Sequence, residues 1–397
     1  MNDPFCIALV FSRNNYRYQS YACQYAGSLL AMQKQVVIFS PDWINLNNYL
    51  LTHFKNKAKF IKCYPLDECV TDTAAISNFA LFAKYLQLSR RLKKAERELQ
   101  TKIECVFFAP VDDWIKPKFG KKTMKWAFAY KWSGLLVNLD SYYKNNLKLN
   151  IDPAFSDADY LLGSQNCISV ATIDRYKSEA IKSRVYKKVI VMPDISDYTL
   201  PDAPLKASRH IKQMAAGRMI TGTILLENEN PENFLKMAAI ADSDTFFFVC
   251  AGVIEPSTLS ELAKQALDKL LQSGKNNTYF ILQSLDERQY INDLVTTFDV
   301  CYLNDGNYNL PHPLLSKAAF FNKPVIGSKN DMTGKLLASF KTGIGVNGKV
   351  SESLNALNLL RLQMPFEHNF DMGKLNNYAK LQGPEALTEA LEELLSF

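Results

Sequence analysis

Two adjacent carboxylates, Asp112 and Asp113, follow an apolar stretch at 103–108 that is predicted to be a buried strand. Side chains just beyond the carboxyl end of a parallel strand lie at the ligand-binding edge of the sheet. A carboxylate there could orient or deprotonate a substrate hydroxyl, so this pair is the candidate for catalysis by a general base. The same pair could cap a helix or lie in a solvated turn, and the sequence leaves both interpretations open.

Two arginines, Arg13 and Arg17, follow the first predicted strand at 5–11. Their guanidinium groups are candidates for binding a phosphate-bearing substrate. The turn at 12–15 has no glycine-rich cradle, so the dinucleotide-binding fingerprint and the phosphate loop of NTPases are both missing from it. We therefore disfavour dehydrogenase and NTPase functions.

The stretch 114–132 interleaves basic and aromatic residues. This composition suits an anionic surface such as an acidic membrane, where each basic residue contributes about 1 kcal/mol. A solvated loop whose aromatic rings pack inward is the alternative, and nucleic acid is disfavoured because the C-terminal half is acidic. The residues concerned are Lys116, Lys118, Lys121, Lys122, Lys125 and Lys131, with Trp114, Phe119, Trp126, Phe128, Tyr130 and Trp132.

Charge is distributed unevenly along the chain of 397 residues, whose net charge is +6. Residues 1–200 hold 28 Lys and Arg against 18 Asp and Glu, a net of +10. Residues 201–397 hold 18 against 22, a net of −4. We expect the two halves to meet different partners.

The composition is that of a globular protein, with 47% hydrophobic and 22% charged residues. No run approaches the ~20 apolar residues of a transmembrane helix, and the N-terminus lacks the features of a secretion signal. Eight cysteines without a C-x-x-C pair are expected to be reduced thiols. Four widely spaced histidines predict no metal site. These features favour a cytoplasmic protein.

Apolar runs alternate with amphipathic helical segments almost throughout, which predicts parallel strands joined by helices. The longest helix is predicted at 75–99, where Leu81, Tyr85, Leu88 and Leu92 share one face. The predicted strands are 5–11, 35–39, 103–108, 134–138, 160–163 and 188–192, followed by 210–217, 245–250, 278–282, 300–303 and 324–327. Helices are expected in the second half near 230–241, 256–273, 286–297, 313–322, 332–340 and 384–396.

A polar segment with three prolines, 192–208, separates the two series of alternating elements. The predicted fold is therefore α/β, with two doubly wound Rossmann-like domains that face a cleft. We place the N-terminal domain at 1–200, the second domain at 201–380 and a C-terminal helix at 381–397, which could pack on the first domain. Ligands of such sheets bind beyond the carboxyl ends of the strands, so the cleft is the expected site.

Segment 294–346 resembles the donor-binding half of GT-B glycosyltransferases, in particular the retaining, nucleotide-sugar-dependent family 4. Ala216-Gly217-Arg218 resembles the glycine–arginine turn of that half, and Asn322-Lys323-Pro324-Val325-Ile326 resembles one of its strands. Residues 280–303 are similar to the family's strand, loop, helix and strand, and 189–197 are similar to its domain junction. These patterns occur in family order over nearly the whole chain.

The sequence departs from the family at both of its usual donor-site glutamates, which are replaced here by Asn309 and Lys317. Asparagine can still bond a sugar hydroxyl, whereas an ammonium group cannot accept a hydrogen bond from a ribose diol. Lys317 could instead pair with a phosphate near the N-terminus of the predicted helix 313–322. Either Lys317 neutralises the diphosphate, or the donor site is degenerate.

By this resemblance, Arg218 and Lys317 would supply the positive charge that a diphosphate leaving group needs, with Lys317 exposed on its helix. The loop before that helix would face the cleft, the end of the 278–282 strand would meet the base, and Asp305 could replace the carboxylate missing at position 317. A helix-capping Arg218 and a merely solvent-exposed His312 are the alternatives. The donor-binding candidates are Arg218, Gln283, Ser284, Asp305, Asn309, Leu310, Pro311, His312 and Lys317.

The resemblance implies transfer of a hexosyl group from a UDP- or GDP-linked sugar to a hydroxyl of a glycan or lipid-linked acceptor. It further implies cell-surface polysaccharide biosynthesis at the inner face of a membrane, with no metal and no permanently bound cofactor. The alternative is a non-catalytic GT-B homologue that binds glycan or serves as an accessory subunit, because both glutamates are replaced. A two-lobed small-ligand binding protein is disfavoured, since it would normally carry an export signal.

Overall fold

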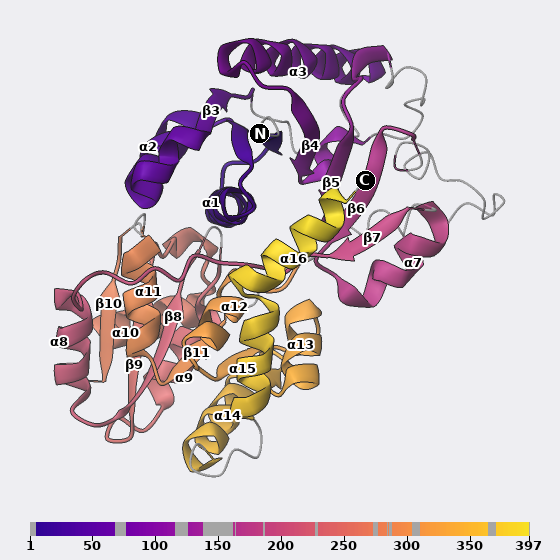
Figure 1. The fold of residues 1–397 in the computed structure, drawn as a ribbon. Helices are drawn as coiled ribbons and strands as arrows, with labels where there is room; N and C mark the ends of the chain where they lie inside the picture. The colour runs from indigo at the N-terminus through magenta and orange to yellow at the C-terminus, as the bar shows by residue number, and fades with distance from the viewer. Residues whose placement is uncertain are drawn as a thin grey trace. The chain divides into compact units, whose positions relative to one another are not determined.

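The computed structural model describes residues 5–67, 77–115, 126–137, 162, 164–185, 187–226, 229–272, 277–283, 285, 288–303, 310–363 and 371–396. The chain forms two compact units (Figure 1). Unit 1 comprises Met1–Ile195 together with Gly383–Phe397, and unit 2 comprises Ser196–Gln382.

Unit 1 contains a sheet of seven strands in the order β3-β2-β1-β4-β5-β6-β7, and every neighbouring pair is parallel. The chain builds outward from β1 to β3 and then returns to the other side of β1 with β4. The switch point of the sheet therefore lies between β1 and β4. The strands are β1 (Cys6–Phe11), β2 (Gln35–Ser40), β3 (Ile61–Pro65), β4 (Ile103–Ala109), β5 (Trp132–Leu136), β6 (Cys167–Thr172) and β7 (Lys188–Val191).

Helix α3 (Asn78–Leu99) confirms the longest predicted helix. The side chain of Ser77 caps it by accepting a hydrogen bond from the Ala80 amide at 3.1 Å. The predicted apolar face is buried in the core of unit 1. The other described helices of this unit are α1 (Tyr16–Ala31), α2 (Trp43–Phe54), α7 (Arg175–Val185) and α16 (Pro384–Leu395), with short 3₁₀ turns η1 (Lys55–Phe60) and η2 (Val111–Trp114).

The C-terminal helix α16 packs on α1, β6 and β7, so the last residues of the chain belong to the first unit. Leu387, Leu391 and Leu394 are buried along its inner face. The Ser169 hydroxyl on β6 donates a hydrogen bond to the Leu394 carbonyl at 2.9 Å. Burial of this apolar face is the main contribution of α16 to the stability of unit 1.

Unit 2 contains a six-stranded sheet in the order β10-β9-β8-β11-β12-β13, again parallel throughout. Its switch point lies between β8 and β11. The strands are β8 (Met219–Ile224), β9 (Phe246–Ala251), β10 (Thr278–Ile281), β11 (Val300–Tyr302), β12 (Val325–Ser328) and β13 (Gly343–Val346). The described helices are α8 (Lys206–Ala215), α9 (Glu232–Ile240), α10 (Glu261–Gln272), α11 (Arg288–Thr297), α12 (Pro313–Phe320), α13 (Met332–Phe340), α14 (Val350–Gln363) and α15 (Met372–Leu381), with a 3₁₀ turn η3 (Pro256–Thr258).

The predicted strand at 210–217 is wrong, because these residues belong to helix α8 and its C-terminal turn. The buried residues of α8 are Ser208, Ile211 and Ala215, which are spaced by the three and four residues of a helical face. The helix ends at Ala216, whose φ of 49° is left-handed, and Gly217 follows with a φ of 86°. The first strand of unit 2 is β8, which begins after Arg218.

The two parallel sheets confirm the predicted fold class of two doubly wound α/β domains. Strands β3, β6, β8 and β13 were not predicted, and the predicted strand at 160–163 lies outside the described residues except for Leu162, which is helical. No helix in the described parts of the chain is both long enough and apolar enough to cross a bilayer.

Most of the described cysteines are packing groups in the two cores, as the sequence predicted for reduced thiols. Burial raises the pKa of the Cys167 thiol and of the Cys250 thiol to about 12. Both thiols are therefore protonated at neutral pH and behave as small apolar side chains. Cys69 lies outside the described residues.

Candidate functional site

A buried charged pair lies at the switch point of unit 1. The last residue of β1, Phe11, stands beside Ala109, the last residue of β4. The guanidinium of Arg13, just beyond β1, donates hydrogen bonds of 2.9 and 2.6 Å to the two carboxylate oxygens of Asp113. Ser12 adds a third bond of 2.6 Å from its hydroxyl, and the Asp113 residue is only 1% exposed.

This arrangement makes Asp113 the partner of Arg13. Burial alone would lower the pKa of Arg13, but the hydrogen bond and charge of Asp113 raise that pKa above its ordinary value. A bidentate pair of this kind fixes the ends of two neighbouring strands relative to each other. Asp113 could take a proton from a substrate only by breaking this pair.

The second predicted catalytic carboxylate, Asp112, has different surroundings. It is half-buried, and its Oδ2 accepts a hydrogen bond of 2.7 Å from the amide of Val137, just beyond β5. No arginine forms a salt bridge with Asp112 within the described residues. Of the two carboxylates, Asp112 is therefore the better candidate for a general base.

Arg17, the other predicted phosphate ligand, lies in a buried network at the start of α1. Its Nη1 is 3.9 Å from Oδ1 of Asp194, and its side chain is 10% exposed. The Tyr21 hydroxyl donates to the same Asp194 oxygen. Burial, followed by the Asp194 charge, raises the pKa of Tyr21 well above its ordinary value, so the phenol remains protonated. This geometry assigns Arg17 to the internal network rather than to an open phosphate site.

A second buried pair, Glu229 and His312, lies at the switch point of unit 2. Glu229 follows β8, and His312 lies between β11 and α12. The His312 Nε2 and the Glu229 Oε1 are 3.1 Å apart, and both side chains are at most 2% exposed. The two units thus share one arrangement, since each has a charged pair where its strand order reverses.

The His312 ring is held from three sides. Its Nδ1 accepts a hydrogen bond of 3.2 Å from the Leu314 amide and so caps α12. Because Nδ1 accepts, the proton of the neutral imidazole belongs on Nε2, which faces Glu229. The His312 amide also donates to the Thr333 hydroxyl at 3.0 Å. Side chains from beyond β8, β11 and β12 therefore meet at this one point.

Lys317 does not lie exposed on its helix, and that expectation is wrong. Its residue is fully buried, and its ammonium donates hydrogen bonds to the carbonyl oxygen of Asp197 and to Oδ1 of Asn292. A buried ammonium is stable only when its donors are satisfied in this way. In this structure Lys317 holds together parts of unit 2 and does not face solvent.

Arg218 lies at the amino end of β8, away from the carboxyl ends where ligands of such sheets bind. Its guanidinium donates to the carbonyls of Met214, Ala215 and Ser243. Arg218 therefore caps the end of α8, which is the alternative that the sequence left open. The cause is the wrong strand assignment, which placed the glycine–arginine turn at the other end of the strand.

The remaining predicted donor residues fall into two groups. Leu310 and Pro311 are buried in the segment that precedes α12, and Gln283 is exposed just beyond the edge strand β10. The structure does not describe Ser284, Asp305 and Asn309. His312 is thus the predicted donor residue that the described structure places at the switch point of unit 2.

The described part of the basic and aromatic stretch 114–132 has mostly inward-facing rings. Trp114, Phe128 and Trp132 are buried in the core of unit 1. Trp126 is 77% exposed and stacks on Phe82 of α3, with ring centroids 5.4 Å apart. Tyr130 donates to Glu96 at 2.9 Å, and Lys131 is exposed. The other five lysines and Phe119 lie outside the described residues.

Sequence reasoning missed Glu229 and, at the end of β12, the exposed Lys329. Both follow strands of unit 2 at the carboxyl edge of the sheet. A correct assignment of 219–224 as the first strand would have pointed to 225–231 as the loop to search. Within the described residues, no group of three metal-ligating side chains is present.

No protein-family model matches the sequence. No curated protein matches it either. Solved structures do resemble it over almost the full length of both chains. A sucrose-phosphate synthase from Thermosynechococcus elongatus is 13% identical, with a TM-score of 0.59 and coverage of 98% of each chain. A glycosyltransferase from Rickettsia africae is 12% identical, with a TM-score of 0.62 and coverage of 99% of each.

A further similar structure is HepE of Anabaena in complex with UDP. It is 13% identical, its TM-score is 0.60, and the match covers 99% of this chain and 100% of that chain. At this level of identity the similarity shows the architecture and not the activity. The chain has the GT-B fold, built from two parallel Rossmann-like sheets of seven and six strands.

Proposed function

We propose that this protein is a GT-B glycosyltransferase that uses a UDP- or GDP-linked sugar as donor. The observation that carries the proposal is the buried Glu229–His312 pair at the switch point of the C-terminal sheet. The HepE structure contains UDP, which supports a uridine nucleotide as the first donor to test. The acceptor would be a hydroxyl of a glycan or lipid-linked molecule in cell-surface polysaccharide biosynthesis.

On the donor side, the proposal assigns His312 and Glu229 to positioning. His312 caps α12, and the positive end of this helix favours an anion placed beyond its first turn. Glu229 fixes the imidazole by accepting the Nε2 proton. Lys329 at the end of β12 is an exposed cation on the same edge of the sheet and could offset diphosphate charge.

On the acceptor side, the proposal assigns the general base to Asp112. In the reaction, the bond between sugar C1 and the phosphate oxygen breaks, and a bond between C1 and the acceptor oxygen forms. Asp112 would take the acceptor proton, and the nucleoside diphosphate would leave with the bonding electrons. Asp113 and Arg13 would hold the loop in which Asp112 lies.

We also propose peripheral contact with the inner face of a membrane, on the basis of two strongly exposed rings. Phe79 is 79% exposed near the start of α3, and Trp126 is 77% exposed. Aromatic rings beside basic residues favour an anionic lipid interface. Flotation with phosphatidylglycerol vesicles tests this. Wild type should co-float, and Trp126→Ser should co-float less, whereas equal recovery of both would contradict the role of Trp126.

The donor proposal is tested by isothermal titration with UDP, GDP and UDP-glucose, and by NMR detection of released nucleoside diphosphate with glycan acceptors. Glu229→Gln should weaken nucleotide binding, because it removes the carboxylate that holds His312. Glu255→Gln is the matched control, since Glu255 is an exposed glutamate of the same unit. An equal loss in both variants would contradict the assigned site.

The non-catalytic homologue remains the second candidate, and one observation favours it. Arg218 and Lys317, the two predicted partners of the diphosphate, are both engaged within the protein. Nucleotide binding without turnover of any donor would support this alternative. Turnover with release of nucleoside diphosphate would dismiss it.

A further inference from the structure

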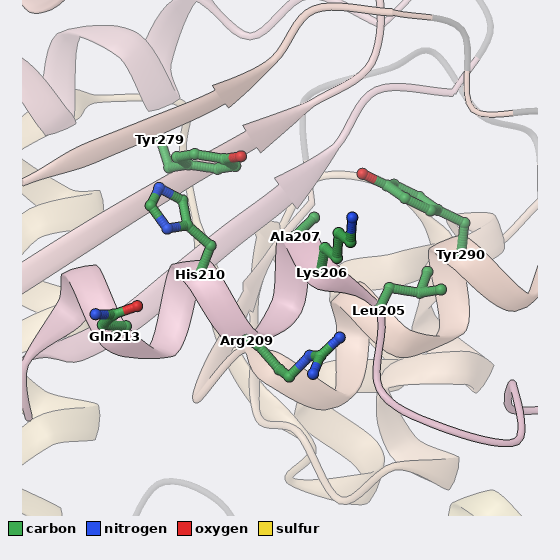
Figure 2. Close-up of a pocket in the computed structure, with 8 residues that line it drawn as sticks. All are labelled: Leu205, Lys206, Ala207, Arg209, His210, Gln213, Tyr279 and Tyr290. Atoms are coloured by element: carbon green, nitrogen blue, oxygen red, sulfur yellow. The ribbon is translucent and has the colours of Figure 1, made fainter.

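Unit 2 carries an open depression of about 790 Å³ along helix α8. Its volume falls within the about 300–1,000 Å³ that is typical of small-molecule sites. The far wall is formed by the edge strand β10 and the start of α11 (Figure 2). The lining residues are Leu205, Lys206, Ala207, Arg209, His210, Gln213, Tyr279 and Tyr290.

This depression is separate from the switch point of the same sheet. Strand β10 is the edge strand, and β9 and β8 stand between it and β11. Neither Glu229 nor His312 lines the depression. A ligand bound there would therefore leave the candidate donor site open.

The near wall is a cationic face of α8. Lys206, Arg209, His210 and Gln213 occur at the spacing of one helical face, and all four are exposed. No acidic side chain of the described residues lines the depression, although Asp286 and Glu287 precede α11 outside those residues. A carboxylate or phosphate could thus pair with Lys206 and Arg209 without displacing a described protein partner.

The far wall supplies two phenols. Figure 2 shows the hydroxyls of Tyr279 and Tyr290 directed toward one another, with Lys206 extending from α8 toward the space between them. The His210 ring meets the Tyr279 ring edge-on at 5.4 Å. Partial burial, then the nearby Tyr279 and Asp293, raises the pKa of Tyr290. Both phenols are therefore protonated at neutral pH and can donate or accept hydrogen bonds.

These features together match one kind of ligand. Aromatic rings offer flat apolar surfaces for sugar rings, phenol and amide groups can bond sugar hydroxyls, and two cations can bond an acidic substituent. The open shape leaves one side of a ligand in solvent, as a segment of a longer chain requires. The net charge of −4 on residues 201–397 disfavours a densely charged polyanion such as nucleic acid.

We propose that this depression binds an anionic oligosaccharide, with carboxylated or phosphorylated sugar units. The inference does not depend on the proposed transferase activity, because the depression lies apart from the donor site. A carbohydrate held on α8 would be retained by unit 2 whether or not the protein transfers a sugar.

The test is fluorescence anisotropy with the full chain and labelled oligosaccharides at low salt. The probes are hexagalacturonate for carboxylates, mannose 6-phosphate as a competitor for phosphates, and maltohexaose as the neutral control. Hexagalacturonate should bind and maltohexaose should not. Competition by mannose 6-phosphate would identify phosphorylated sugars as a second source, and its failure would restrict the site to carboxylated ones.

Variants locate the site. Lys206→Ala combined with Arg209→Ala should weaken hexagalacturonate binding about tenfold, as expected for losing two charge-assisted hydrogen bonds. Tyr290→Ala should weaken it as well. Lys212→Ala is the matched control, because Lys212 is an exposed cation of α8 that does not line the depression. Circular dichroism and melting curves verify that each variant is folded.

Three results would overturn the proposal. Equal weakening by Lys212→Ala would mean nonspecific attraction to a basic helix. Equal binding of maltohexaose would remove the role of the acidic group. Tighter binding of a single-stranded oligonucleotide through Lys206 and Tyr290 would replace the carbohydrate with nucleic acid.

Discussion

The ammonium of Lys317 on α12 donates a hydrogen bond to the main-chain carbonyl of Asp197, at the beginning of unit 2. It also donates to the Asn292 side chain, whose Nδ2 in turn donates to the Thr199 carbonyl at 2.7 Å. The Lys317 nitrogen lies 5.7 Å from the centre of the Tyr198 ring. One buried charge thus joins α11 and α12 to the segment that enters unit 2.

We expect Lys317→Met to destabilise unit 2 by about 2–4 kcal/mol, because it leaves two buried acceptors without their donor. Urea unfolding measures this change. Lys335→Met is the control, since Lys335 is exposed on α13, and it should change the free energy of unfolding by less than about 0.5 kcal/mol. Lys317→Glu should unfold the unit outright. A stable Lys317→Glu protein with weakened nucleotide binding would instead return Lys317 to the donor site.

The two neighbouring carboxylates of unit 1 should respond oppositely to the same substitution. Asp113→Asn breaks the pair with Arg13, whose side chain is 31% exposed, and should cost somewhat less than the about 3–5 kcal/mol of a fully buried pair. Asp112→Asn keeps an oxygen for the Val137 amide, so its cost should stay below about 1 kcal/mol.

Turnover separates their roles further. Under the proposed function, Asp112→Asn should lower the turnover rate by about 10²–10⁴ while nucleotide binding is retained. Chemical denaturation and turnover assays on both variants check this pattern. Full activity in Asp112→Asn would remove that residue as the base.

A pH dependence is expected from Glu232, which begins α9 and binds Lys236 and the hydroxyl of Ser260. The hydrogen bonds from Lys236 and then Ser260 hold the pKa of Glu232 below its ordinary value of 4.5. Its contribution to stability is therefore complete above pH 4.5 and is lost as the pH falls through the lowered pKa.

Glu232→Gln checks this sign. The difference in unfolding free energy between wild type and Glu232→Gln should be largest at pH 7 and should shrink between pH 4.5 and pH 3, where the wild-type carboxylate becomes protonated. Urea titrations at these three pH values measure it. A difference that grows toward low pH would contradict the assignment.

Gly222 in β8 leaves room for the ring of Phe298. A Cβ atom at position 222 would lie 2.3 Å from atoms of that ring, which is 1% exposed. Gly222→Ala should therefore destabilise unit 2 by about 1–3 kcal/mol through overpacking. Phe298→Leu should rescue part of this loss in the double variant, and a thermodynamic cycle measures the coupling. Additive effects would show that the two residues do not compete for the same space.

The alternation of strands and helices was predictable because buried parallel strands have a strong apolar signature, as in β1, β9 and β12. Helix α8 was not, because its few apolar residues are small and occur close together near Ala215 and Ala216. The weaker strand β8 contains Thr and Gly, since Gly222 must admit the Phe298 ring. The packing of a distant ring thus disguised the strand in the sequence.

The candidate site was less predictable, because its geometry depends on pairs far apart in the chain. Arg13 and Asp113, and Glu229 and His312, meet only when the strands are in order. Each single residue could equally have been solvated. Lys317 is the reverse case, since a lysine on a short helix suggests a surface position and only the acceptors at Asp197 and Asn292 explain its burial.

The return of α16 to unit 1 has a consequence for synthesis on the ribosome. Unit 2 is one continuous segment, Ser196–Gln382, while unit 1 needs Gly383–Phe397 as well as the first 195 residues. Chains are made from the N-terminus, so unit 2 can fold completely while unit 1 still lacks the helix that covers part of its sheet. The nascent protein therefore exposes an apolar stripe on α1, β6 and β7 until translation ends, and a chain truncated before Leu387 would keep that stripe exposed permanently.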